Sequence, residues 1–288
     1  MLHSMTGFAR QSVETALGAL TWELRAVNHR YLDISFKLPD ELRPKEQAFR
    51  QQIGSKLKRG KVECAFRFRP AFDAGTEMPL NDELVKLVSS RLQTIASGLD
   101  GANPVSPIDI LRWPGVIRQS EVDLEPLFAA ARSLLDEAID AMSGMRASEG
   151  ERIASMLESR CADIGNLATS VRARMPEVLE ATRLRQRERV ERLEVEADPE
   201  RLELELALIA QKIDVDEEVD RLDSHVTEIR ETLAKDEPVG RRLDFLMQEL
   251  NREANTLGSK SADTETTRAA VELKVLIEQM REQVQNVE

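Results

Sequence analysis

The sequence predicts an α+β fold: a small N-terminal β-sheet domain with a covering helix, followed by a long-helix, mainly α C-terminal domain. Three observations support this class. Apolar residues alternate with polar ones before Arg69, and they recur at three- and four-residue spacing after Asp123. Aromatic residues make up only 4% of the chain, which leaves Leu, Val, Ile and Ala to build the core. We divide the chain into domains 1–155 and 156–288.

The first seventy residues carry the strand signals. Apolar side chains occupy alternate positions at Leu20, Trp22, Leu24 and Ala26, at Leu32, Ile34, Phe36 and Leu38, and at Val62, Cys64, Phe66 and Phe68. Residues 41–60 space three apolar side chains four apart, Phe49, Ile53 and Leu57, which predicts a helix ending at Gly60. The predicted order is β-β-β-α-β, with the helix covering one face of an antiparallel sheet.

After Asp123 the chain is predicted to be almost entirely helical. Prolines at 126, 176, 199 and 238 are each expected near a helix start. Gly258 is predicted to end one helix and Ser261 to cap the next, which continues to about residue 285. Three apolar stripes are predicted to be buried: Val215, Val219, Leu222, Val226, Ile229 and Leu233; Leu243, Leu246, Met247, Leu250, Ala254 and Leu257; and Leu273, Leu276, Ile277, Met280 and Val284.

The sequence indicates in which compartment the protein works. No apolar run approaches the roughly 18 residues that a membrane span needs, so we expect no membrane partner. The start, MLHSMTGFAR, has no apolar core of signal-peptide length. We therefore expect a cytoplasmic protein in which Cys64 and Cys161 are free, packed thiols.

Charge is distributed unevenly along the chain. The net charge is −12, yet residues 1–70 contain 13 Lys and Arg against 7 Asp and Glu. An acidic total argues against nonspecific coating of nucleic acid but allows a local basic surface. Six basic residues of the first domain could line a phosphate-binding face: Arg25, Arg30, Arg59, Lys61, Arg67 and Arg69. The alternative is an ordinary solvated sheet face.

Two predicted helices carry polar groups that could form a site. In the first, helical spacing stacks Asp214, Glu218, Arg221 and His225 along one edge of the buried stripe. The second places Glu249 and Glu253 one turn apart. Such groups can hold Mg²⁺ or Mn²⁺, or they can simply pair with neighbouring arginines. An antiparallel hairpin around Pro238 would bring the two helices together.

These segments resemble the YicC/YloC family of bacterial endoribonucleases from end to end. The resemblance rests on SMTGFAR, ELRAVNHRYLD, KRGKVE and DILRWPGV in the first half, and on IDVDEEVDRLDSHV, GRRLDFLMQELNREANTLGSKS and ELKVLIEQMREQVQNVE in the second. It implies metal-dependent endonucleolytic cleavage of RNA by a cytoplasmic homo-oligomer, a hexamer, linked to RNA turnover and to other RNA-decay proteins.

The chemistry of the residue types assigns candidate roles to these motifs. Glu218, Glu249, Glu253 and His225 are the candidate ligands of Mg²⁺ or Mn²⁺, and His225 could instead be the general acid or base. Five basic residues of the same helices would hold phosphates: Arg221, Arg241, Arg242, Arg252 and Lys260. Two alternatives stay open. The protein could be a non-catalytic RNA-binding adaptor that presents RNA to another nuclease. The helical domain could also be only an oligomerisation device, if its polar edge is fully paired internally.

Overall fold

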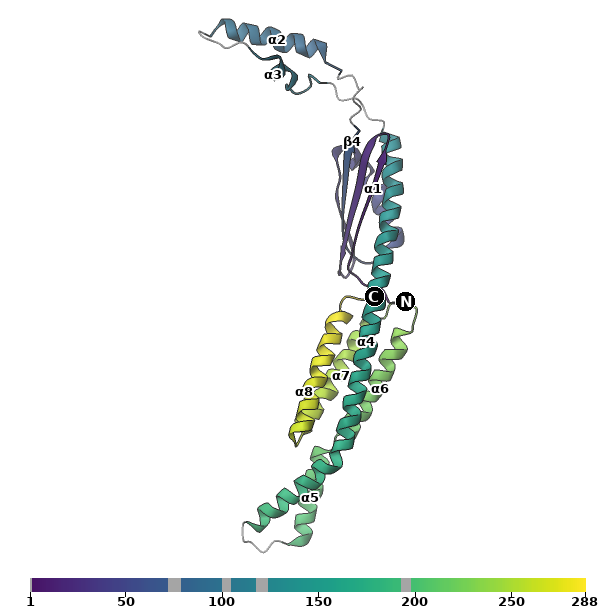
Figure 1. The fold of residues 1–288 in the computed structure, drawn as a ribbon, viewed down its shortest axis with the longest axis vertical. Helices are drawn as coiled ribbons and strands as arrows, with labels where there is room; N and C mark the ends of the chain where they lie inside the picture. The colour runs from purple at the N-terminus through teal and green to yellow at the C-terminus, as the bar shows by residue number, and fades with distance from the viewer. Residues whose placement is uncertain (1, 72–78, 100–104, 118–123, 193–197) are drawn as a thin grey trace.

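The chain folds into an elongated structure in which a β-sheet domain and a helical bundle follow each other along one long helix (Figure 1). It is a computed structural model that describes residues 2–71, 79–99, 105–117, 124–192 and 198–288. The sheet domain contains β1 (Gly7–Thr15), β2 (Gly18–Val27), β3 (Leu32–Lys37), the 3-10 helix η1 (Asp40–Lys45), α1 (Glu46–Lys56) and β4 (Gly60–Pro70). The other helices are α2 (Asp82–Ser97), α3 (Pro107–Leu111), α4 (Leu124–Glu191), α5 (Pro199–Ile213), α6 (Asp216–Leu233), α7 (Gly240–Lys260) and α8 (Thr264–Val284). The predicted fold class is confirmed.

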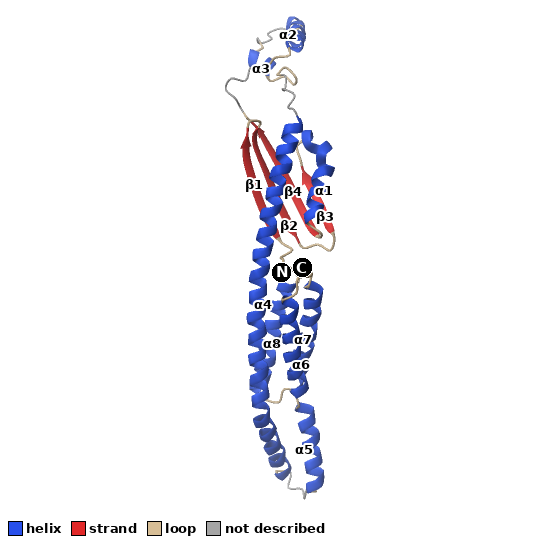
Figure 2. Cartoon of the chain, turned by 90° about the vertical axis from the view of Figure 1, so that its right-hand side faces the viewer, coloured by secondary structure: helices blue, strands red, loops and turns tan. Residues whose placement is uncertain are grey.

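The sheet has four strands in the order β1-β2-β4-β3 (Figure 2). β1 pairs antiparallel with β2, and β2 pairs antiparallel with β4, whereas β3 runs parallel to β4. The prediction of an antiparallel sheet is therefore wrong for β3. Its connection explains the difference: the chain leaves β3, passes through η1 and α1, and re-enters the sheet in the same direction, which is the crossover that a parallel pair requires.

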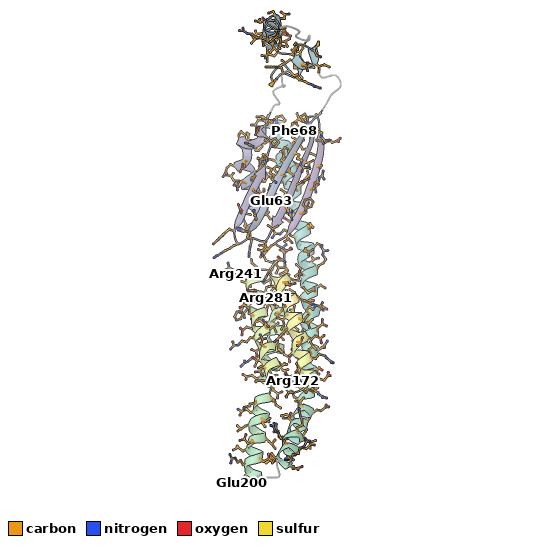
Figure 3. The ribbon with its side chains drawn as sticks, turned by 90° about the vertical axis from the view of Figure 1, so that its left-hand side faces the viewer. Glu63, Phe68, Arg172, Glu200, Arg241 and Arg281 are labelled. Carbon is orange, nitrogen blue, oxygen red and sulfur yellow. The ribbon has the colours of Figure 1, made fainter. Side chains whose placement is uncertain are left out.

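Two helices, rather than one, cover the apolar face of this sheet. Phe49 of α1 is fully buried in the sheet core, as predicted, and the first half of α4 lies across β1 and β2. The indole N–H of Trp22, on β2, donates a 2.9 Å hydrogen bond to the backbone carbonyl of Ala131 on α4. The opposite face carries exposed polar residues and is seen in Figure 3, where Glu63 is labelled. The sheet is thus anchored on one side and open on the other.

Helix α4 contains 68 residues, a length of about 100 Å. Its buried residues contact first the sheet core and then the bundle core. Pro176 lies inside α4, so the prediction that each proline marks a helix start is wrong there. Proline removes one helical hydrogen bond, but Met175 and Val178 on either side of it are buried, and this packing holds the turn. Because α4 also runs through residue 155, the domain division there stays a prediction.

The bundle consists of the second half of α4 with α6, α7 and α8. The predicted stripes are its core: every member is buried except Leu233, which is partly buried against the others. The turn between α7 and α8 differs from the prediction. α7 continues past Gly258 to Lys260, and the residue that caps α8 is Asp263, whose carboxylate accepts a 2.9 Å hydrogen bond from the Thr266 amide.

The two chain ends meet where the sheet domain joins the bundle (Figures 1 and 2). His3 and Glu288 exchange backbone hydrogen bonds of 3.1 and 2.9 Å. The buried guanidinium of Arg146, on α4, donates to the backbone carbonyl of Ser4 and to the Glu288 carboxylate, both at 2.5 Å. A side chain at Gly150 would collide with the backbone of the N-terminal segment. Both termini and α4 therefore form one packed joint.

Helices α2 and α3 lie beyond the sheet domain, at the end of the molecule opposite the bundle (Figures 1 and 2). They pack on each other. None of the described helices is long and apolar enough to cross a membrane.

Candidate active site

Helices α6 and α7 form the antiparallel hairpin that the sequence predicts, and ion pairs join them along one edge. The three pairs are Glu218 with Lys260, Arg221 with Glu253, and Glu228 with Arg242. The Lys260 ammonium donates hydrogen bonds of 2.8 and 2.9 Å to the two carboxylate oxygens of Glu218. The guanidinium of Arg221 lies 3.5 Å from the Glu253 carboxylate. We call these six residues, together with His225 and Glu249, the polar edge.

Two carboxylates of the polar edge are almost completely buried. Glu218 is 4% exposed and Glu253 is 3% exposed. A charged group at such a position must be paired, because removing it from water is costly. Lys260 and Arg221 provide the partners. The carboxylates of Glu217 and Glu253 in turn raise the pKa of Arg221, which therefore stays charged. These closed pairs act first of all as contacts between the helices.

His225 and Glu249 occupy the position of the polar edge at which no pair has formed. His225 comes four residues after Arg221, and Glu249 comes four residues before Glu253. In an antiparallel hairpin, equal steps in opposite directions lead to facing positions, so His225 lies opposite Glu249. Both side chains are half-buried, and neither makes a hydrogen bond or ion pair with any residue that the structure describes. This open position lies between closed ion pairs on either side.

The four predicted metal ligands do not assemble into one metal site. Across the described ranges of the chain, no three His, Cys, Asp or Glu side chains are grouped so that they could hold a metal ion. Lys260 and Arg221 already neutralise Glu218 and Glu253. A divalent cation, which would prefer these same carboxylate oxygens, would have to displace them. The residues of a single chain therefore do not fit a preformed metal centre, and metal dependence stays a prediction.

The predicted phosphate-holding residues of the hairpin are spread along it. Arg221, Arg242 and Lys260 are engaged in ion pairs, whereas Arg241 and Arg252 are exposed. Arg242 and Lys260 are 18 residues apart, which separates them by about 27 Å along α7. Arg241 lies near the joint with the sheet domain (Figure 3). The structure does not bring these five residues together.

Four of the six basic residues predicted in the first domain share the open face of the sheet: Arg25, Lys61, Arg67 and Arg69. This face also carries acidic side chains, and Arg67 lies 3.5 Å from Glu23. The other two residues lie elsewhere. Arg30 follows β2 and stacks over the Tyr31 ring at 5.2 Å. Arg59 is half-buried in the joint, 3.8 Å from the carboxylate of Glu288.

An arginine-lined pocket of about 530 Å³, which was not predicted from the sequence, lies between the end of α4 and the turn after α7. It is lined by Thr182, Arg185, Gln186, Glu188, Arg189, Arg192 and Ala262. The signal was present, since residues 182–192 contain five arginines and two glutamates. Only the helix shows that Arg185 and Arg189, one turn apart, face the same side. Within the described residues, neither of these two arginines pairs with a carboxylate. Such a pocket is suited to an anionic ligand.

Comparison with known proteins gives consistent matches over the whole chain. The family model described as "Endoribonuclease YicC-like, N-terminal region" matches residues 2–155, and "Endoribonuclease YicC-like, C-terminal" matches residues 171–288. A Haemophilus influenzae protein named "Probable endoribonuclease YicC" is 44% identical over 288 residues, covering 100% of both chains. A Clostridioides difficile protein of the same name is 30% identical over 293 residues, again covering 100% of both. These matches confirm the resemblance seen in the motifs and the predicted class of enzyme. The chain belongs to the endoribonuclease YicC-like family.

Proposed function

We propose that this protein cleaves RNA phosphodiester bonds internally, in the cytoplasm, as part of RNA turnover, and that His225 and Glu249 carry the chemistry. The observation that supports this assignment is the open position of the polar edge. Of the four predicted catalytic residues, Glu218 and Glu253 are buried in ion pairs, whereas His225 and Glu249 face each other without partners in the described chain. A pair that must exchange protons with a substrate needs this freedom.

The residue types fit acid–base cleavage of RNA. Cleavage requires removal of a proton from the attacking hydroxyl and delivery of a proton to the leaving oxygen. Imidazole can do either near neutral pH, and a carboxylate opposite it can orient the ring or accept a proton. Positioned proton transfer contributes about 10²- to 10⁴-fold in rate. Arg221 lies one turn from His225, about 6 Å along the helix, where its charge would stabilise a phosphate.

Divalent-metal dependence belongs to the proposal as a separate, testable part. The geometry of one chain does not support it, because Lys260 and Arg221 hold two of the candidate ligands. Cleavage by the purified protein should be measured with Mg²⁺, with Mn²⁺ and after treatment with EDTA. Full activity after EDTA would remove the metal from the proposal while leaving the acid–base pair in place.

The decisive experiment compares two histidine variants. His225→Ala should lower the rate of RNA cleavage about 10²-fold or more and should remove one limb of its pH profile. His29→Ala is the matched control, because His29 is exposed in the loop after β2 and belongs to neither helix of the hairpin. Cleavage by folded His225→Ala at the wild-type rate and with the wild-type pH profile would refute the assignment.

A non-catalytic RNA-binding adaptor is the second candidate, because the ion pairs of the polar edge can join the two helices without any catalytic role. At three of the four positions of the polar edge, an ion pair joins α6 and α7, as expected for a purely structural interface. The same assay separates the two functions. An adaptor would bind the RNA, leave it intact with every cation tested, and change the products of other RNA-decay proteins when these are added.

A further inference from the structure

The unit formed by α2 and α3 does not cover its own apolar surface. Among the large apolar side chains that the structure describes in this unit, only Val88 and Val116 are buried. The chain exposes twenty large hydrophobic residues within its described part, and eight belong to this unit: Leu80, Leu87, Ile95, Leu99, Val105, Ile108, Trp113 and Ile117. Monomeric proteins rarely leave such a concentration open to water. Some other surface must therefore cover it.

Helix lengths explain why α3 cannot supply that cover. α2 has 16 residues and α3 has five, so they are about 24 Å and 7.5 Å long. α3 and the residues after it reach the first half of α2, where the Asn81 amide bonds to the Val116 carbonyl at 2.8 Å. The second half of α2, with Ile95, extends past them, and Leu99 follows the end of the helix. A pair of helices this small does not hold a stable fold unaided.

One exposed line of α2 combines apolar and charged residues in a regular order. Glu83, Leu87, Arg91 and Ile95 follow each other at four-residue intervals, which places them on one side of the helix. All four are exposed, Leu87 at 54% and Ile95 at 58%. Glu83 and Arg91 lie at equal distances before and after Leu87. If a second copy of the helix runs antiparallel and is centred on Leu87, its Arg91 lies opposite Glu83 and its Glu83 lies opposite Arg91.

We propose that this line is the contact surface for α2 of a second copy of the chain. The two helices cross antiparallel about a two-fold axis at Leu87, as in isologous dimers. Glu83 of each copy then meets Arg91 of the partner subunit, and the two Leu87 side chains pack together at the centre.

Charge favours a second copy at this position. Residues 79–117 contain four acidic residues (Asp82, Glu83, Asp100, Asp109) and three basic ones (Lys86, Arg91, Arg112), so this segment has a net charge of only −1. The chain as a whole carries −12, so the bodies of two copies repel each other. This nearly neutral unit projects from the end of the molecule, beyond the sheet domain (Figures 1 and 2). Contact at this unit keeps the acidic bodies apart.

The test uses light scattering of the full-length chain and dissociation measured by dilution. Leu87→Asp should raise the dissociation constant of the α2 contact about 100-fold and at least halve the mass of the assembly. Leu204→Asp is the matched control and should leave both unchanged, because Leu204 is 62% exposed on α5, at the other end of the molecule. Circular dichroism would show that both variants keep their helices.

The charged pair tests the direction of the helices. Glu83→Arg and Arg91→Glu should each weaken association about tenfold, since each places like charges together. The double variant, Glu83→Arg with Arg91→Glu, restores opposite charges and should return to within about threefold of the wild-type constant. A monomeric wild-type chain at micromolar concentration, an unchanged mass for Leu87→Asp, or a double variant as weak as the single ones would overturn the proposal.

Discussion

Two Glu→Gln substitutions on the same hairpin should affect different properties, one the stability of the fold and the other the rate of RNA cleavage. Glu218→Gln removes a charge that is 4% exposed and accepts two short hydrogen bonds from Lys260. Glu249→Gln removes a half-exposed charge with no partner among the described residues. Glutamine keeps the size of the side chain in both cases. We therefore expect Glu218→Gln to act on stability and Glu249→Gln to act on cleavage.

The magnitude for Glu218→Gln follows from its contacts. Hydrogen bonds to charged groups contribute about 1.5–3 kcal/mol, and the Lys260 ammonium, left without its carboxylate, is partly compensated by water because its side chain is 28% exposed. We expect a loss of about 1–3 kcal/mol in the free energy of unfolding, or roughly 3–10 °C in Tm for a chain of this size. A double-mutant cycle with Lys260→Met should show a coupling of about 0.5–3 kcal/mol.

Cleavage measured with enzyme in excess separates this effect from catalysis. Glu249→Gln should reduce the rate of cleavage by about 10²- to 10⁴-fold, while its Tm stays within about 1 °C of the wild-type Tm. Glu272→Gln, an exposed carboxylate on α8, is the control and should change neither quantity. The reasoning is refuted if folded Glu249→Gln cleaves RNA at the wild-type rate, or if Glu218→Gln is as stable as the wild type.

Three further predictions concern other parts of the molecule. Arg67→Glu combined with Arg69→Glu should weaken RNA binding and flatten its dependence on salt without lowering the Tm, because both side chains are exposed on the open sheet face. If RNA binding is weakened only by Arg185→Glu combined with Arg189→Glu, the RNA lies along the arginine pocket instead. Burial raises the pKa of the Cys64 thiol to about 12 and that of Cys161 to about 11, so neither should react with an alkylating reagent at pH 8 until the protein is unfolded, and rapid labelling of native protein would contradict their burial. At Asp263, burial pushes the pKa of the carboxyl upward, but hydrogen bonds from Thr266 and Arg174 outweigh it and hold the pKa below its usual value. This group therefore stabilises the fold above about pH 4 and loses that effect as the pH falls further; Asp263→Ala should cost about 1 kcal/mol at pH 7 and less in acid, as measured by urea unfolding.

Local patterns predicted most of the architecture because helix and strand periodicity are written in neighbouring residues. The alternation around Trp22 and the three- and four-residue spacing of α6, α7 and α8 identified the buried faces, which the structure confirms. The errors lie where distant packing outweighs a local signal. Pro176 lies inside α4 because neighbouring residues are buried against other elements, and Gly258 does not end α7, which continues to Lys260.

The candidate site shows the same limit more sharply. Helical spacing alone placed Glu218 and His225 on one edge, and Glu249 and Glu253 on another. It could not show which carboxylates had cationic partners, because those partners are up to 42 residues away in sequence.

The sequence by itself determined the fold class, the buried stripes, the hairpin and the family, since each depends on patterns within single elements or on motifs read along the chain. The tertiary structure decided which strand runs parallel and that α4 joins both domains. It also decided that Lys260 and Arg221 form ion pairs with two of the predicted metal ligands, Glu218 and Glu253. It also left His225 and Glu249 without partners among the described residues, and it left apolar residues of α2 exposed. The physical reason is that ion pairing and burial depend on distances in space. A periodic pattern fixes the face on which a side chain lies, but not the residue that it meets there.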